Sequence, residues 1–319
     1  KPKKFLKVNP DGVSENDFIF ILGYPGRTFR NYPYQYIQYQ EIYQLPYIAE
    51  LYRYLINSYD KLSENNVDTY LKLTSKSKSL ANVEKNYRGK LLGLKRLQIV
   101  EKKKEEDESL NNFIQNNSEV KSQYGNLFNE LNNVYQEIFD LGRTNLFYSQ
   151  LINRSDLINL SHILLTYFEE KERPDNERKN LYQTKNIEQL EKRIDYYYES
   201  YVEEAEKITL KKILNDATKY DELKNISFVK NLIKNSEQKN NSKEEIDKFV
   251  DNLINNTVIK DKNIFYKLLE KSKEEIDSLN DPLITFVNEV GKSNELLNEK
   301  NDELNGKLNI LLAQYIDVK

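Results

Sequence analysis

The chain has 319 residues, with 48 Lys and Arg side chains against 51 Asp and Glu side chains and a formal net charge of −3. This near balance, without a basic block, excludes the phosphate-neutralising surface that a nucleic-acid-binding protein needs, and the length allows one large domain or two ordinary ones. The sequence has no Cys and only one His, His162, which excludes disulfides, thiol nucleophiles and Cys- or His-rich metal sites, so we expect no cofactor.

The chain has no candidate membrane span and no candidate signal peptide. No stretch approaches the roughly 18 consecutive apolar residues that cross a membrane, and no apolar segment follows the basic start at residues 1–4. The sequence also contains no Met. Because a gene product begins with Met, we expect a chain that opens on Lys1 to be processed, trimmed or part of something longer.

The first part of the chain differs from the rest in its proline content. Of the 7 prolines, only Pro174 and Pro282 lie beyond residue 46. An apolar, β-branched and aromatic run at residues 17–22 lies between two turn signals and predicts one buried strand. Residues 5–8 predict a second strand, which would complete a hairpin too small to bury a core by itself.

From Tyr34 onward the apolar residues recur at spacings of 3 and 4, which predicts amphipathic helices of roughly 10 to 20 residues. Pro46 predicts a kink or break in the first of them. Ser155 marks a helix start, and Ser242 and Ser272 each open a Ser-Lys-Glu-Glu capping box. We therefore predict a mainly α fold of many helices with a short N-terminal β-hairpin or strand segment.

Few residues of these helices are candidates for chemistry. His162 follows Ser161, but neighbouring residues of a helix point about 100° apart and cannot form a nucleophile–base pair, so we interpret His162 as a core or helix-face residue. Carboxylate pairs such as Glu203 and Glu204, and the charged tract at 102–108, are interpreted as solvated helix faces. The tyrosines around residues 32–43 and 196–201 are assigned to helix packing, with ligand stacking as the alternative.

One turn has a specific local design. Residues 23–28 read Gly-Tyr-Pro-Gly-Arg-Thr, so the expected strand ends in a tight turn whose glycines allow backbone angles closed to other residues. Arg27 and Thr28 then present guanidinium and hydroxyl groups beside the turn. Taken alone, this pattern fits any turn at the end of a strand.

Taken with other segments, the turn carries a resemblance. Residues 1–6, 12–18 and 23–28 resemble a segment of the S46 family of bacterial dipeptidyl peptidases. A second block at 80–89 and 93–97 is similar to that family's Asn-x-Trp-Lys-Asn-x-x-Gly segment and follows the first at a matching distance. Asn-Asp-Pro-Leu at 280–283 is similar to a third, weaker family landmark.

The resemblance implies an architecture and a division into domains. The family has a chymotrypsin-like double β-barrel that is interrupted by a large helical domain, which caps the active-site cleft. By this resemblance, residues 1–31 form a strand and turn segment of the barrel, and residues 32–319 form the helical cap. The catalytic His, Asp and Ser of the family then lie outside this chain, which we expect to be inactive by itself, and His162 matches no catalytic position.

The resemblance also implies one substrate-binding residue. Asn82 aligns with the family's cap-domain asparagine, which hydrogen-bonds the free α-amino group of the peptide, and a helix cap or a surface Asn is the alternative. Glu84 stands where the family usually has Trp; its carboxylate either attracts the amine or marks a reshaped pocket. Gly23, Pro25, Gly26, Arg27 and Thr28 are interpreted as the structural junction between strand and cap.

Two functions follow for comparison. In the first, the chain is the helical cap of a serine exopeptidase that releases dipeptides from peptide N-termini. Its partners are then the peptide substrate, the remaining β-barrel parts and, by resemblance, a second copy in a homodimer, in the periplasm or outside the cell. In the second, the chain is a non-catalytic helical module that binds other proteins through its helix faces.

Overall fold

A computed structural model describes residues 3–4, 6–20, 22–23, 29–237 and 242–319. The chain divides into two compact units, Lys1–Tyr32 and Pro33–Lys319. A boundary between compact units does not identify the domain on either side. The assignment of residues 1–31 and 32–319 to two domains of a longer peptidase therefore stays a prediction.

The described residues of the first unit form turns and irregular segments, without a strand. The backbone N–H of Ser14 donates to the Asp17 carboxylate at 2.7 Å, and the Phe18 side chain is 90% exposed. A strand needs a partner for its backbone hydrogen bonds and an apolar layer to cover it, and the described residues supply neither. The predicted β-hairpin and barrel strand are therefore wrong here, whereas the mainly α part of the predicted fold is confirmed.

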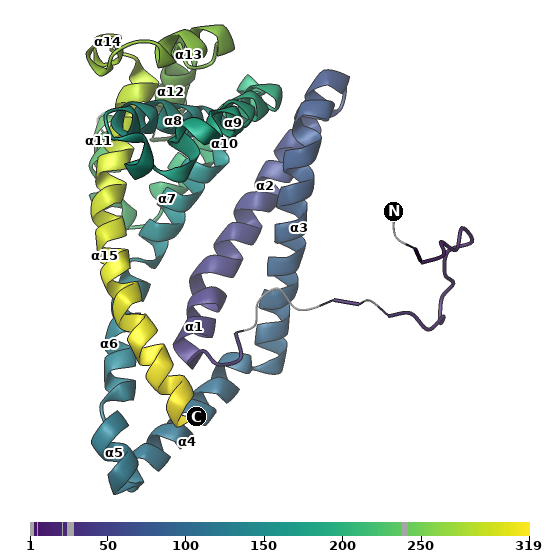
Figure 1. Cartoon of the computed structure of the whole chain (residues 1–319), viewed down its shortest axis with the longest axis vertical. Helices are drawn as coiled ribbons and strands as arrows, with labels where there is room; N and C mark the ends of the chain where they lie inside the picture. The colour runs from purple at the N-terminus through teal and green to yellow at the C-terminus, as the bar shows by residue number, and fades with distance from the viewer. Residues whose placement is uncertain (1–2, 5, 21, 24–28, 238–241) are drawn as a thin grey trace. The chain divides into compact units, whose positions relative to one another are not determined.

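All the regular secondary structure in the described part of the second unit is helical (Figure 1). The chain from Pro33 to Lys171 forms α1 (Tyr34–Tyr39), the π-helical turn η1 (Gln40–Gln44), α2 (Leu45–Ser63), α3 (Val67–Leu97), α4 (Ile99–Asn116), α5 (Ser118–Tyr124), α6 (Leu127–Asp140), α7 (Gly142–Arg154) and α8 (Asp156–Lys171).

The longest of the remaining elements is α15, of 37 residues. They are η2 (Asp175–Glu177), η3 (Asn180–Tyr182), η4 (Thr184–Asn186), α9 (Ile187–Glu199), α10 (Glu203–Ala217), η5 (Leu223–Asn225), α11 (Ser227–Glu237), α12 (Ser242–Asn256), α13 (Lys262–Leu269), α14 (Lys273–Asp277) and α15 (Pro282–Val318).

The helix starts follow local sequence rules. The Ser155 hydroxyl accepts from the Ile158 N–H at the start of α8, and Ser272 and Glu275 complete a capping box at the start of α14. Both predicted starts are confirmed. Residue 242 begins α12 as predicted, although its side chain lies outside the described residues.

Pro46 lies in the first turn of α2, directly after η1. A proline inside a helix lacks the N–H donor and its ring collides with the carbonyl four residues earlier. The π-helical turn relieves that collision, because it widens the helix by one residue at this place. The expected irregularity at Pro46 is confirmed, as a widened turn.

Two hydrophobic cores hold the helices of this unit together. The main core joins α2 and α3 to α7–α14 and the first half of α15. The second core joins α4, α6 and the last half of α15, through Ile114, Leu127, Phe128, Leu131, Val134, Tyr135, Leu304, Leu311 and Tyr315. Because α15 supplies side chains to both, it connects the two cores. In Figure 1 the second half of this helix runs alongside α6.

Close packing beside η1 depends on one glycine. Gly142 is buried at the start of α7, and a Cβ atom placed on it would lie 2.8 Å from Cε2 of Tyr39. The Tyr39 ring also stacks on Phe139 with 6.0 Å between the ring centroids. The approach of α1 and η1 to α7 therefore requires glycine at position 142.

Candidate functional site

Asn82 lies in the middle of α3, a helix of 31 residues. The helix begins at the Asn66 side chain, which accepts from the Thr69 N–H at 3.0 Å, and it ends at Gln98, whose φ is 51°. The Asn82 side chain is exposed and makes no hydrogen bond to a described residue. A helix cap is therefore excluded as its role, and its amide is open to a ligand.

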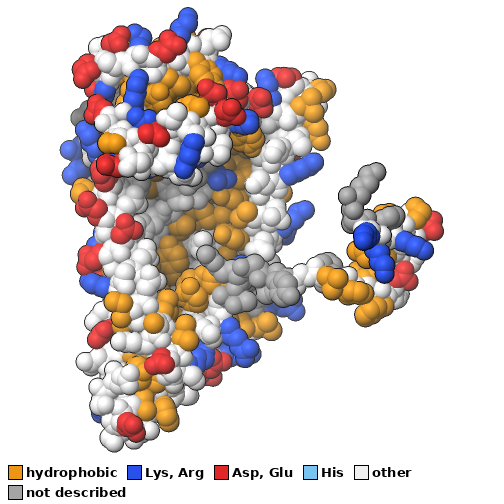
Figure 2. All heavy atoms as spheres, in the orientation of Figure 1, with side chains coloured by type: hydrophobic (Ala, Val, Ile, Leu, Met, Phe, Trp, Pro, Cys, Tyr) orange, Lys and Arg blue, Asp and Glu red, His pale blue; other side chains and the backbone are white. Residues whose placement is uncertain are grey.

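The surface around Asn82 is basic. Lys78 lies one turn before Asn82, and Lys85 and Asn86 lie one turn after it, so these exposed side chains share one face of α3. Lys and Arg side chains protrude along this helix (Figure 2). Glu84 is the one acidic residue between positions 69 and 97.

Glu84 points away from this face. Two residues apart on a helix are separated by about 200°, and the Glu84 carboxylate is buried against α2. Its Oε1 lies 2.8 Å from Nη2 of Arg53 and 3.1 Å from Nε of Arg88. Both guanidinium groups compete for this oxygen, so the carboxylate does not line the Asn82 face and is not free to attract a peptide amine there.

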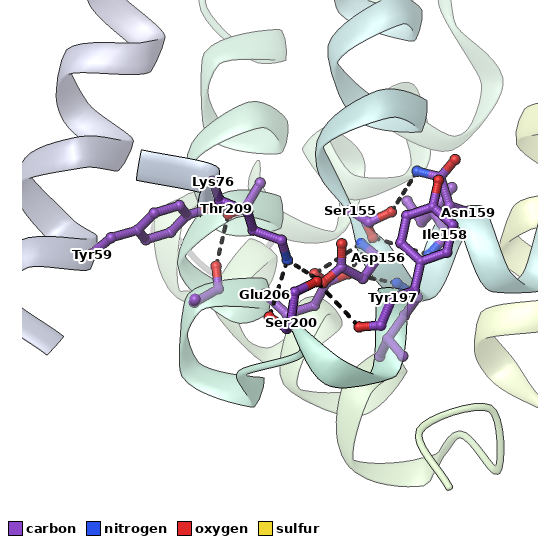
Figure 3. A network of polar contacts seen from close by, with 12 residues as sticks. Tyr59, Lys76, Ser155, Asp156, Ile158, Asn159, Tyr197, Ser200, Glu206 and Thr209 are labelled. Carbon is purple, nitrogen blue, oxygen red and sulfur yellow. Dashed lines mark hydrogen bonds and ion pairs between the residues drawn. The ribbon is translucent and has the colours of Figure 1, made fainter. Parts of the chain in front are cut away.

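A buried polar cluster ties α3 to the other helices (Figure 3). The Lys76 ammonium forms an ion pair with Asp156 at the first residue of α8 and donates to the backbone carbonyl of Ser200 at 3.3 Å. The Asp156 side chain is 7% exposed and that of Lys76 is 22% exposed. This cluster joins three helices, α3, α8 and the end of α9.

Glu206 of α10 completes the cluster at the N-terminus of α8. The backbone N–H groups of Asp156 and Leu157 each donate to its carboxylate at 3.1 Å, and the Ser155 hydroxyl also donates to it. Burial and, after it, the charge of the Asp156 carboxylate raise the pKa of Glu206 to about 7, while the Lys76 ammonium opposes the rise. Burial also raises the pKa of Asp156.

A second buried cluster lies between α1, α4 and α15. The Lys103 ammonium donates to Asp107 at 3.0 Å and to the Tyr315 hydroxyl at 2.7 Å, and this hydroxyl donates to Asp107 at 2.6 Å. The Tyr34 backbone N–H also donates to Asp107, at 2.8 Å. The tract 102–108 is thus a solvated helix face at most positions, but Lys103 and Asp107 are buried and structural.

The single histidine has no catalytic neighbour among the described residues. His162 is exposed on α8, while the Ser161 hydroxyl is buried and donates to the Leu157 carbonyl at 2.8 Å. Desolvation and the positive charges of Lys179 and Arg193 lower the pKa of His162. The predicted helix-face position of His162 is confirmed, and Ser161 and His162 form no nucleophile–base pair.

Neither the segment 29–237 nor the other described segments bring three His, Asp or Glu side chains together as metal ligands. No helix in the described part of the chain combines the length and the apolar character of a membrane-crossing segment.

The junction motif is only partly visible. Gly23 is exposed and lies in an irregular segment. Pro25, Gly26, Arg27 and Thr28 lie outside the described residues, so their role as a structural junction stays a prediction.

Sequence reasoning missed Lys76, Asp156 and Glu206. The available signal was positional, because Glu206 shares the apolar face of α10 with Leu210 and Ile213, at helical spacings. By contrast Glu204, which the sequence assigned to a solvated face, is exposed.

Comparison with known proteins gives dipeptidyl-peptidases as relatives of this chain. The Asp/Glu-specific dipeptidyl-peptidase of Shewanella putrefaciens is 27% identical over 194 residues, which cover 61% of this chain and 26% of that protein. Dipeptidyl-peptidase 7 of Capnocytophaga gingivalis is 31% identical over 137 residues, which cover 43% of this chain and 19% of that protein. The matched part is thus about a quarter or less of these relatives' length.

Solved structures show the same fold. The crystal structure of Porphyromonas endodontalis DPP11 in complex with the dipeptide Arg-Asp matches with a TM-score of 0.68 at 15% identity, covering 99% of this chain and 44% of that one. The complex of the same protein with substrate matches with a TM-score of 0.63. The sequence model of Peptidase S46 matches residues 1–319, the full sequence, and the chain therefore belongs to the Peptidase S46 family.

Proposed function

We propose that this chain is the helical part of a serine peptidase that releases dipeptides from peptide N-termini, and that it covers the cleft and anchors the substrate amine. Membership of the S46 family over the whole sequence supports the peptidase assignment. The observation that carries the anchoring role is the exposed Asn82 amide, which makes no hydrogen bond to the described residues. The catalytic groups belong, in this proposal, to other parts of a longer protein.

The chemistry of the anchor is a hydrogen bond from the peptide ammonium to the Asn82 amide oxygen. An amide oxygen accepts from an ammonium without forming a strong ion pair. Lys78 and Lys85 flank Asn82 with positive charge, which repels an ammonium. A carboxylate from another part of the complete protein is therefore needed beside Asn82 to hold the amine, and such a pair would select substrates with a free N-terminus.

The test uses the complete peptidase that contains this chain. Asn82→Ala removes the acceptor, and we expect kcat/KM for a dipeptidyl chromogenic substrate with a free amine to fall about 10- to 100-fold, the range for a hydrogen bond to a charged group. Asn86→Ala is the matched control, because Asn86 is exposed one turn later on the same helix. An unchanged kcat/KM in Asn82→Ala removes Asn82 from the site.

A non-catalytic interaction module is the second candidate, and one observation favours it. Val67, Tyr70 and Leu71, at the start of α3, are 75%, 55% and 67% exposed, and hydrophobic side chains are visible at this tip of the α2–α3 hairpin (Figure 2). Apolar side chains that gather on a surface mark contacts with other proteins. This candidate predicts that the complete protein releases no dipeptide from any peptide with a free N-terminus.

A further inference from the structure

We propose that Lys76 and Asp156 are positioning residues, which fix α3 on the helices behind it and so hold Asn82 in place for the substrate amine. The effect on substrate binding rests on the proposed function, whereas the attachment of α3 to α8 does not. The ion pair of Lys76 with Asp156 is buried, the start of α8 is held in place by a third helix, and Asn82 lies close to Lys76 on the same helix.

The anchor is a buried charge pair between segments 80 residues apart in sequence. The Lys76 side chain is mostly covered and that of Asp156 is almost completely covered. Breaking such a pair leaves an uncompensated buried charge, which is strongly unfavourable. The ion pair therefore resists separation of α3 from α8, whereas the pair of Lys72 with Asp68 is exposed and lies within α3.

The start of α8, which carries Asp156, is itself held in place by a third helix, α10. Glu206 of α10 accepts from the backbone N–H groups of Asp156 and Leu157, so it fixes the first turn of α8. The Ser200 carbonyl at the end of α9 gives Lys76 a second acceptor. Figure 3 shows the Asp156 carboxylate and the Ser200 carbonyl beside the Lys76 ammonium, with Glu206 next to Ser155 and Asp156. The Lys76 ammonium is thus held between two acceptors, the Asp156 carboxylate and the Ser200 carbonyl.

Asn82 follows the position of Lys76 because both belong to one continuous helix. Six residues separate them, which corresponds to about 9 Å along the helix axis. On the other side of Asn82, Glu84 joins α3 to Arg53 of α2. The hydroxyl of Tyr59 on α2 in turn hydrogen-bonds Thr209 of α10 at 2.7 Å. Asn82 therefore lies between two ion pairs of α3, that of Lys76 with Asp156 of α8 and that of Glu84 with Arg53 of α2. Only the first of them joins α3 directly to α8.

The mechanical claim is tested on the 319-residue chain by spin-label distances. The chain has no Cys, so Lys85→Cys on α3 and Lys192→Cys on α9 give two labels at exposed sites. We expect Lys76→Met to broaden the label–label distance distribution, Lys76→Arg to restore it, and the control Lys72→Met to leave it unchanged. If Lys76→Met fails to fold, the double variant Lys76→Met with Asp156→Asn removes both charges and takes its place.

The catalytic claim is tested in the complete peptidase with the same variants. We expect Lys76→Met to raise KM for free-amine substrates about 10-fold, equivalent to about 1.4 kcal/mol, with a smaller change in kcat, and Lys76→Arg to recover most of it. An unbroadened distance distribution overturns the anchor, whatever the enzyme does. A broadened distribution with unchanged KM, in an enzyme where Asn82→Ala does raise KM, overturns the positioning role. If Asn82→Ala has no effect, the proposed function fails and the distance measurement alone decides the anchor.

Discussion

The guanidinium of Arg53 on α2 donates twice to one carboxylate oxygen of Glu84 on α3, at 2.8 Å through Nη2 and 3.2 Å through Nε. Glu84 is 6% exposed, whereas the Arg53 side chain is 56% exposed. The carboxylate is therefore the buried member and the guanidinium reaches down to it from solvent. This relationship fixes the α2–α3 hairpin at the level of Asn82.

A double-mutant cycle of Arg53→Ala and Glu84→Ala measures this tie. We expect a coupling free energy of about 1 kcal/mol, because the exposed guanidinium is screened by water while the carboxylate is not. The exposed pair of Lys72 and Asp68 on α3 is the control and is expected to give a coupling nearer zero. Chemical denaturation of the four chains of each cycle gives the coupling, and equal values for the two pairs would contradict the assignment.

Glu206 predicts a pH dependence of stability. Its pKa rises from 4.5 to about 7 on folding, so the folded state binds the proton more tightly than the unfolded state. The stabilisation is then fully present below pH 4.5 and is lost as the pH rises through 7, by about 3 kcal/mol in all. The free energy of unfolding of the wild type should therefore fall between about pH 5 and 8. We expect this fall to be smaller in Glu206→Gln.

The measurement is denaturant unfolding at several pH values within that window. Glu204→Gln, at an exposed position two residues away, is the matched control and should keep the wild-type pH profile. Parallel profiles for Glu206→Gln and wild type would show that Glu206 does not titrate in this range.

Gly142 predicts a steric effect of a single methyl group. In Gly142→Ala the new Cβ meets the Tyr39 ring at 2.8 Å, and we expect a loss of about 1–3 kcal/mol of stability, the range for overpacking. Gly306→Ala is the control, because no atom lies near that Cβ in α15; it should stabilise by about 0.5–1 kcal/mol. Thermal unfolding separates the two, and a neutral Gly142→Ala would mean that the ring yields.

The parts of the fold that local sequence determines were predictable. Helix starts at Ser155 and Ser272 depend on residues within one turn, so their sequence signals were sufficient. The disturbance at Pro46 follows equally from the missing N–H. The expected strand at residues 17–22 failed because a strand depends on a partner from elsewhere, and no local pattern specifies that partner.

The buried charges Lys76, Asp156, Lys103 and Asp107 were not predictable, for a similar reason. Lys76 and Asp156 come together from positions 80 apart, and each looks like an ordinary surface charge in its own helix. Lys103 and Asp107 lie in a charged tract whose other members are solvated, and the Tyr315 hydroxyl that completes their cluster is 208 residues from Asp107. Asn82 was singled out by family resemblance alone, since its helix gives no chemical reason to prefer it.

The π-helical turn η1 sets the rotational phase of α1 against the rest of its helix. A deletion of one residue among 40–44 would remove the widened turn and bring the Pro46 ring back against the carbonyl four residues earlier. It would also rotate α1 by about 100° relative to α2. Gln35 would swing off Asn132, to which its amide donates at 2.6 Å, and Tyr39 would leave Gly142. The extra residue in η1 therefore gives α1 the rotation about its axis that its contacts with Asn132 and Gly142 require.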